Sequence, residues 1–246
     1  MSNNRHDILE NLNQKDVLKS KMVRLLKRTG SMLKIYRSGK IPRSIKIISV
    51  LKNFEEILWF TRPDTWSPHA LYAVTKLFLK NLRPLQLERF LTMVFIPRLQ
   101  ENIFQKNKKV SVHIFMTLKM ISKIPKIFFS LIILPTAESL NFTTREAILF
   151  SILISKISVP REIVSTFLSM FLRQNFTNEK LILLNSILNK NFLLPIRMID
   201  MLVDFFIYSK NFNKTIYFQK CFFSFLRNYS KFISKEDRLK LKKKIK

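Results

Sequence analysis

The three histidines are the most versatile side chains for chemistry in this chain, because imidazole can bind a metal or transfer a proton. They are His6, His69 and His113, and no two of them stand in a metal-binding spacing such as HxxxH. A zinc site normally needs four nitrogen, sulfur or oxygen ligands, and the chain has a single cysteine. The sequence therefore predicts no metal site.

Two further groups have types that could support catalysis. Asp200 and Asp204 are four residues apart and would share one helix face, where paired carboxylates can bind magnesium. Arg197 lies three residues before Asp200, so a surface ion pair explains the carboxylates better. Cys221 has no nearby histidine to act as its base, which favours a core side chain over a nucleophile.

Glycine is nearly absent, with only Gly30 and Gly39. A loop that cradles phosphates needs several glycines, so that backbone N–H groups can approach the ligand. A Rossmann fingerprint and a Walker loop are therefore excluded, and methyltransferase, GTPase and kinase activities are disfavoured. Without a nucleophile, a metal site or a cofactor loop, no active site can be assembled, and we expect a non-catalytic protein with no cofactor.

The charge of the chain points to a polyanionic partner. Lys and Arg number 44 and Asp and Glu number 16, which gives a formal net charge of +28. Self-repulsion of this size is relieved by nucleic acid, because neutralised phosphates release condensed counterions. A membrane surface is an alternative, and a lysine-rich surface that only contacts water is another.

The positive side chains are clustered along the sequence in a way that suits recognition of RNA by its phosphates and shape. The basic tail Lys235–Lys246 is equally well explained as a nuclear import signal. The candidate RNA-binding residues are Arg37, Lys40, Arg43 and Lys46; Lys119, Lys123 and Lys126; and Arg145, Lys156 and Arg161.

The elements that must position these groups are predicted to be helices throughout, because apolar residues recur three and four positions apart. Ser67-Pro68 and the capping box Thr143–Glu146 are helix starts. The segments between breaks favour antiparallel helix pairs in an irregular HEAT-like stack. Helix stops are expected at Pro84, Pro97, Pro125, Pro135, Pro160 and Pro195.

Three regions are expected: a basic amphipathic N-terminal helix within 1–35, a helical-repeat domain over 36–232 and a basic C-terminal segment over 233–246. Gly30 should end or bend the first helix. Residues 38–50 should be extended, because Gly39 and Pro42 both break helices. Met1 to Gln14 carries no apolar signal-peptide core, and no apolar run is long enough to span a bilayer.

Aromatic side chains raise the question of base stacking or partner contact. We expect Trp59 and Trp66 to pack the corner around Pro63-Asp64, and an exposed Trp66, with His69, would be a candidate partner interface. The double phenylalanines are better explained by burial than by stacking on bases; they are Phe128-Phe129, Phe205-Phe206 and Phe222-Phe223.

Six segments, taken in order, resemble those of one protein family. The first contains YRSGKIPRSIKIISVLKNFEEILWFTRPDTWSPHALYAVTKLFLK. The others are FLTMVFIPRLQEN, VHIFMTLKMISKIP, IFFSLIILPTAESLNFTTREA, KISVP and LNKNFLLPIRMID, so the resemblance covers about Tyr36–Tyr208. The order is similar to that of the bystin family, in a short form that lacks the usual acidic N-terminal arm. The chain also departs from the family at Arg161–Val164, where small residues are usual.

The resemblance implies a helical, non-catalytic factor in small-ribosomal-subunit assembly and export. The expected partners are precursor small-subunit rRNA, small nucleolar RNA, small-subunit ribosomal proteins and other assembly factors. The expected location is the nucleolus and nucleus, with shuttling to the cytoplasm, as a monomer within a large ribonucleoprotein particle and without a membrane. The alternatives are a basic helical-repeat adaptor and a peripheral membrane-surface protein, which residues 8–35 would serve as an amphipathic helix.

Overall fold

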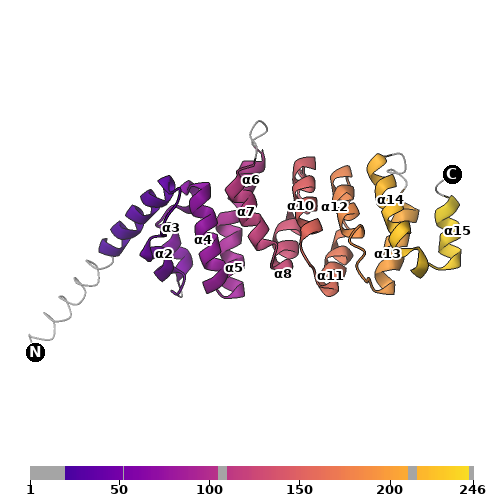
Figure 1. The fold of residues 1–246 in the computed structure, drawn as a ribbon, viewed down its shortest axis with the longest axis horizontal. Coiled ribbons are helices and arrows are strands. Elements are labelled where there is room, and N and C mark those ends of the chain that lie inside the picture. The colour runs from indigo at the N-terminus through magenta and orange to yellow at the C-terminus, as the bar shows by residue number, and fades with distance from the viewer. Residues whose placement is uncertain (1–19, 52, 105–109, 210–214, 244–246) are drawn as a thin grey trace, which may run out of the picture. The chain divides into compact units, whose positions relative to one another are not determined.

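The computed structural model describes residues 20–51, 53–104, 110–209 and 215–243, and every regular element in these ranges is helical (Figure 1). This confirms the predicted all-α class. The chain divides into two compact units, Met1–Leu118 and Lys119–Lys246. The HEAT-like assignment and the predicted three-region division stay predictions.

The first unit begins, in its described part, with a helix over residues 20–35. The helices that follow are α2 (Arg43–Ile48), α3 (Phe54–Trp59), η1 (Pro63–Thr65), α4 (Pro68–Asn81), α5 (Pro84–Phe90), η2 (Leu91–Phe95), α6 (Ile96–Phe104) and α7 (Val112–Ile121), whose last turn belongs to the second unit.

The second unit continues with helices of similar length. They are α8 (Pro125–Ile127), η3 (Phe128–Ile133), α9 (Leu134–Glu138), α10 (Thr144–Lys156), α11 (Arg161–Phe171), α12 (Asn178–Leu188), α13 (Ile196–Tyr208), α14 (Ile216–Tyr229), η4 (Ser230–Phe232) and α15 (Lys235–Lys243).

Gly30 does not end the first helix, which continues to residue 35, so the expected helix end at this glycine is wrong. A Cβ atom at Gly30 would lie only 2.2 Å from the carbonyl oxygen of Thr61. The glycine therefore serves close packing of the helix against the chain after α3. Leu26 and Leu33 are buried on the same helix. The predicted helical residues 8–19 lie outside the described ranges.

Residues 38–50 are not extended, contrary to the prediction, because α2 forms within them. Pro42 is the N-cap of α2, so it begins a helix here. Ile45 and Ile48 lie three residues apart and are buried, and this burial favours the helix. Gly39 takes a positive φ of 104° in the preceding turn.

Pro97 and Pro135 do not stop their helices, although the other predicted stops are helix starts. Each follows a π-helical segment, η2 or η3, and occupies the second position of the next α-helix. The wider π turn moves the carbonyl with which the proline ring would clash, so the helical run continues. The position of a proline in the sequence does not reveal such a π turn. The helix stops predicted at Pro97 and Pro135 are therefore wrong.

The predicted helix caps are confirmed. The side chain of Ser67 accepts a hydrogen bond from the N–H of Ala70 at 3.1 Å. Thr143 and Glu146 form the reciprocal box: the Thr143 N–H donates to Glu146 Oε2 at 2.8 Å, and the Glu146 N–H donates to Thr143 Oγ1 at 3.3 Å.

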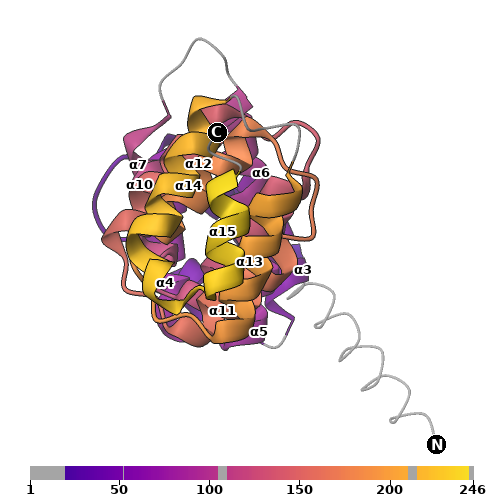
Figure 2. The ribbon, with the colours of Figure 1, turned by 90° about the vertical axis from the view of Figure 1, so that its right-hand side faces the viewer.

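The long helices of the second unit form two layers. In one layer α10 packs on α12 and α12 packs on α14. In the other, η3 contacts α11, α11 contacts α13 and α13 contacts α15, as the end-on view shows (Figure 2). Successive helices therefore alternate between the layers.

Phenyl rings form a continuous chain of contacts through the second unit. Neighbouring ring centroids lie between 4.4 and 5.8 Å apart. Cys221 is fully buried beside this core; its Sγ donates to the Leu181 carbonyl, and burial raises its thiol pKa well above the usual value. The chain runs through Phe128, Phe129, Phe167, Phe171, Phe176, Phe205, Phe206, Phe225 and Tyr229.

Burial of the double phenylalanines is confirmed for most of their members but is wrong for Phe223, which is 59% exposed. Phe205 is half-buried. In the helix α14, Phe222 faces the core and its neighbour Phe223 faces outward, since adjacent helical residues point about 100° apart.

Among the described residues, no single helix is long and apolar enough to cross a membrane. The helices Val112–Ile121 and Pro125–Glu138, taken together, are long and apolar enough, but they are bent by 114° at the break between them. They meet the test by length and composition alone.

Replacing Phe206 should destabilise the second unit strongly. Phe206 is fully buried and contacts the rings of Phe205, Phe218, Phe222 and Phe225. The change Phe206→Ala should lower the free energy of unfolding by about 3–5 kcal/mol in urea denaturation.

The matched control is Phe223→Ala, which removes a phenyl ring of the same unit from the outer face of α14. Its effect should stay within about 0.5 kcal/mol. Equal destabilisation by both changes would contradict the assignment of the phenyl chain as the core.

Candidate nucleic-acid interface

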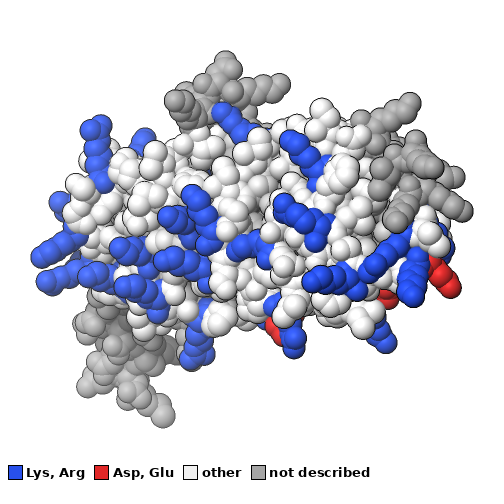
Figure 3. All heavy atoms as spheres, turned by 45° about the vertical axis from the view of Figure 1, so that its right-hand side comes forward, with Lys and Arg blue, Asp and Glu red and all other residues white. Residues whose placement is uncertain are grey.

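Residues 20–50, which we call the basic segment, contain no Asp or Glu. All nine of their Lys and Arg residues are exposed. Figure 3 shows one face of the molecule, on which Lys and Arg side chains are numerous and few acidic atoms appear. The nine are Lys21, Arg24, Lys27, Arg28, Lys34, Arg37, Lys40, Arg43 and Lys46.

The local clusters in the sequence predict only the last four of these cations as candidate RNA-binding residues. The other five lie on the helix over residues 20–35, immediately before them. The signal that would have found them is the absence of acidic residues over the whole of 20–50, which a search for local clusters does not detect.

Hydrogen bonds hold the basic segment to the rest of the first unit. The Ser67 N–H donates to the Leu33 carbonyl at 3.1 Å, and Ser67 Oγ donates to the Tyr36 carbonyl at 2.5 Å. The hydroxyl oxygens of Thr29 and Ser44 lie 2.8 Å apart and link the first helix to α2. The cations are therefore carried on a fixed scaffold, although their side chains reach into solvent.

The acidic side chains described in the first unit lie elsewhere. Its described ion pairs join Arg89 to Glu55 at 3.0 Å and Arg98 to Glu101 at 2.9 Å. Neither pair includes a residue of the basic segment, so its charge is not balanced by a salt bridge within the described ranges. This is the electrostatic character expected of a surface that binds phosphates.

Trp66 is buried, with 1% of its surface exposed, as expected for a side chain that packs this corner; the exposure that a partner anchor would need is absent. Its indole N–H donates to the Thr61 carbonyl at 3.1 Å. Trp59, expected to pack the same corner, is 49% exposed. Trp66 is buried because its ring fills the corner between α3 and α4.

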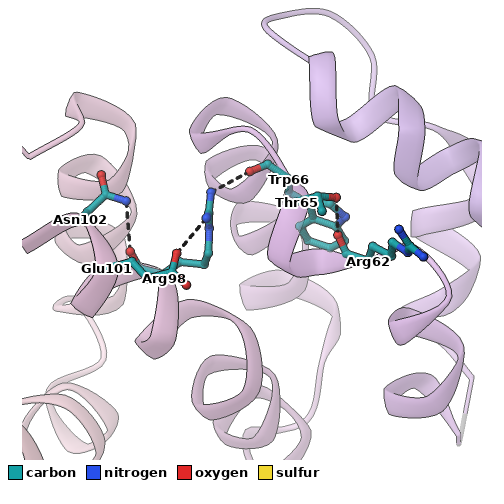
Figure 4. Close-up of polar contacts among 6 residues, drawn as sticks. All are labelled: Arg62, Thr65, Trp66, Arg98, Glu101 and Asn102. Atoms are coloured by element: carbon teal, nitrogen blue, oxygen red, sulfur yellow. Dashed lines mark hydrogen bonds and ion pairs between the residues drawn. The ribbon is translucent and has the colours of Figure 1, made fainter. Parts of the chain in front are cut away.

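Arg98 supports this corner, a role that no pattern in the sequence indicates. Its guanidinium donates to the Trp66 carbonyl at 3.0 Å and to Glu101 at 2.9 Å (Figure 4). In the same view the Arg62 side chain points away from these contacts. Arg98 is thus a structural cation, whereas Arg62 is exposed.

His69, the other candidate partner residue, is half-buried and its ring contacts that of His113, with centroids 3.7 Å apart and the planes tilted by 34°. The edge of Tyr72 approaches His113 at 6.2 Å. Burial, and then the charge of His69, lower the pKa of His113. Among the described residues, no group of three or more possible ligands could hold a metal ion.

The second predicted cluster lies around the turn between α7 and α8. Lys119 lies near the end of α7, Lys123 in the turn that follows, and Lys126 in α8, and all three are exposed. They belong to the second unit, together with the π-helical segment η3 that follows them.

The third predicted cluster is not brought together as one group. Arg145 and Lys156 lie at opposite ends of α10, about 16 Å apart along its axis. Arg161 follows the next corner and pairs with Glu162 at 3.0 Å. Arg145 is half-buried, so Lys156 is the exposed member of this set that has no ion pair within the described ranges.

Some lysines have structural roles. Lys180 donates to the Asn175 carbonyl at 2.8 Å, and Lys190 donates to the Ile157 carbonyl. Burial lowers the pKa of both ammonium groups. In the basic tail, Leu241 is buried and Lys240 pairs with Asp237 at 3.2 Å, so α15 is docked through its described residues.

Asp200, Asp204 and Arg197 are all exposed. The expected pairing of Arg197 with these carboxylates does not occur among the ion pairs of the described residues.

Comparison with known proteins shows the family to which the chain belongs. A family model described as Bystin matches residues 2–246, more than the segment 36–208 on which the sequence resemblance rested. The chain belongs to the Bystin family. It is 35% identical to Bystin from Nematostella vectensis over 220 residues, which cover 89% of this chain and 51% of that relative.

Other members of the Bystin family show similar agreement. Bystin from Dictyostelium discoideum is 32% identical over 236 residues, covering 94% of this chain and 49% of that protein. Bystin from Homo sapiens is 33% identical over 190 residues, covering 77% and 43%. The chain spans about half the length of the curated relatives it matches.

Removing Arg98 should loosen the Trp66 corner. The change Arg98→Met leaves the Trp66 carbonyl without its charged donor, and loss of such a bond costs about 1.5–3 kcal/mol of unfolding free energy. The control Arg89→Met removes an exposed ion pair and should cost less than about 1 kcal/mol. Urea denaturation checks both, and equal costs would contradict the role of Arg98.

The lowered pKa of His113 should make folding stability depend on pH. The unfolded state binds the proton more tightly, so stability is fully present above about 6.5, the unfolded value, and is lost as the pH falls through the folded pKa. Melting temperatures should therefore fall between neutral and acidic pH. The change His113→Gln should flatten that slope, and an unchanged slope would contradict the assignment.

Proposed function

We propose that this member of the Bystin family is a non-catalytic ribosome-assembly factor that binds precursor small-subunit rRNA. The observation that carries the proposal is the basic segment, with nine exposed cations and no acidic residue over residues 20–50. Family membership supports it, since the resemblance found in the sequence implies this role.

The proposed mode of binding is contact with the RNA backbone. Phosphate contacts fix the position and orientation of a protein without reading base sequence. Folded RNA suits such a surface, because its shape and its phosphates are what a protein can recognise on a helix. The phenyl rings that could stack on bases are mostly buried in the core of the second unit, which leaves electrostatic contact as the main interaction.

The second basic cluster, Lys119, Lys123 and Lys126, adds a further contact for the same partner or a neighbouring RNA segment. Holding an immature rRNA arrangement at separate points would keep it in place until later factors displace the protein. In this role the chain works with small-subunit ribosomal proteins and other assembly factors in the nucleolus and nucleus.

A second candidate function rests on a specific observation. The helix over residues 20–35 exposes Met22, Leu25, Met32 and Ile35 beside its cations. A basic helix with an exposed apolar face is also typical of proteins that bind at a membrane surface. Anionic liposomes, offered without RNA, would retain the protein if this function were the right one.

The experiment for the proposed function is crosslinking to RNA in cells, followed by sequencing of the attached fragments. A sharp peak on precursor small-subunit rRNA is expected. The double change Lys40→Gln and Lys46→Gln should weaken that peak. With purified protein, it should lower the slope of log affinity against log salt by about 0.7 for each phosphate that the protein no longer neutralises.

The matched control is the double change Lys220→Gln and Lys231→Gln, which removes the same charge from exposed positions in the second unit. It should leave the peak in place. Crosslinks spread evenly over all RNA, or equal losses in both double variants, would reduce the effect to nonspecific net charge and overturn the proposal.

A further inference from the structure

A pocket of about 260 Å³ lies between the first helix and the chain that follows α3. Three cations line it: Lys27 and Lys34 from the helix, and Arg62 from the corner. Gly30 and Thr61 lie where the two walls meet. Sequence patterns do not indicate this pocket, because its two walls come from segments about thirty residues apart.

The helix places its two lysines on one side of the pocket. Lys27 and Lys34 are seven residues apart, which is close to two full helical turns, so both point in nearly the same direction. Gly30 lies between them and has no side chain, and the Thr61 carbonyl fills the space that a Cβ would need. The pocket is therefore closed at its base by close backbone packing and is bordered by ammonium groups.

Arg62 contributes the third cation from a backbone conformation that arginine rarely adopts. Its φ is 49°, in the left-handed region, and a proline follows it. Its carbonyl accepts bonds from the Thr65 N–H at 3.0 Å and from the Thr65 hydroxyl at 2.9 Å, which fix the turn. Glycine or asparagine would fit this position with less strain, and strained residues of this kind gather at binding sites.

The charge of the pocket is uncompensated. None of its lining residues is acidic, and none of its three cations takes part in an ion pair among the described residues. The nearest acidic residue in sequence, Asp64, is exposed and does not line the pocket. The hydroxyls of Ser31 and Thr61 donate to backbone carbonyls, so the cations supply the free donors.

We propose that this pocket binds a phosphate group of the RNA backbone. The inference rests on the proposed function and names the point at which the basic segment grips its partner. One phosphate would be shared by Lys27, Lys34 and Arg62, and the neighbouring exposed cations Arg24 and Arg28, which lie one turn apart on the same helix, would contact the next part of the backbone.

The position of the pocket favours RNA over a lipid headgroup. Of the four exposed apolar side chains of this helix, Leu25 and Met32 each lie two residues before a pocket lysine. Two residues on a helix are about 200° apart around its axis. A helix that buried Leu25 and Met32 in lipid would thus turn Lys27 and Lys34 away from the headgroups.

The test compares the full chain with the double variant Lys27→Gln and Lys34→Gln. The control is Lys76→Gln with Lys80→Gln, which removes the same charge from exposed positions on α4 in the same unit. In fluorescence anisotropy with a labelled RNA hairpin, the pocket variant should bind at least about tenfold more weakly, and the control should weaken by less than about twofold. Equal weakening would overturn the pocket while leaving the proposed function in place.

Inorganic phosphate is the second probe and does not depend on RNA. At matched ionic strength, phosphate in place of chloride should raise the melting temperature of the full chain and of the α4 control, but not that of the pocket variant. An equal rise in all three would overturn the pocket. A phosphate effect with no RNA binding by the full chain would overturn the RNA assignment and the proposed function together.

Arg62→Gly separates charge from folding. Because glycine relieves the left-handed backbone, the variant should melt no lower than the full chain while binding the hairpin more weakly. Arg62→Lys should restore most of the binding. A lower melting temperature with unchanged affinity would make Arg62 a structural residue.

Binding of phosphatidylserine vesicles that disappears in the pocket variant, while RNA binding stays unchanged, would overturn the inference in favour of a membrane.

Discussion

The first unit depends on one carbonyl group, that of Thr61. It lies against Gly30, where a Cβ would come within 2.2 Å, and it accepts the indole N–H of Trp66 at 3.1 Å. The Trp66 carbonyl in turn accepts the guanidinium of Arg98. This series joins the first helix, the corner after α3 and the helix α6, and it works together with the hydrogen bonds from Ser67 to the Leu33 and Tyr36 carbonyls to hold the basic segment on the first unit.

The second unit is held by a different interaction, the packing of phenyl rings. The contacts pass between helices of both layers, for example from Phe171 to Phe176 and on to Phe205. Aromatic pairs bury a large area and favour edge-to-face arrangements, so they fix how helices meet as well as stabilising them.

The excess of positive charge destabilises the folded chain by self-repulsion, which the ion pairs within the described ranges do not cancel. Two lysines that are used structurally, Lys180 and Lys190, donate to backbone carbonyls. The cations of the basic segment remain exposed and without acidic partners in the described ranges. A polyanion that covers this surface would stabilise the folded chain as it binds.

The sequence by itself determined the helical class, the caps at Ser67 and Thr143, the family and the basic character of the surface, because these depend on local pattern and composition. It did not determine that Pro97 and Pro135 would lie inside continuous helices, since a π turn depends on how neighbouring helices pack. Nor did it show that, of the two tryptophans expected to pack one corner, Trp66 is buried and Trp59 is exposed. The pocket was decided only by the tertiary structure: Lys27 and Lys34 share a helix face, but Arg62 joins them because Gly30 lets two distant segments come into contact.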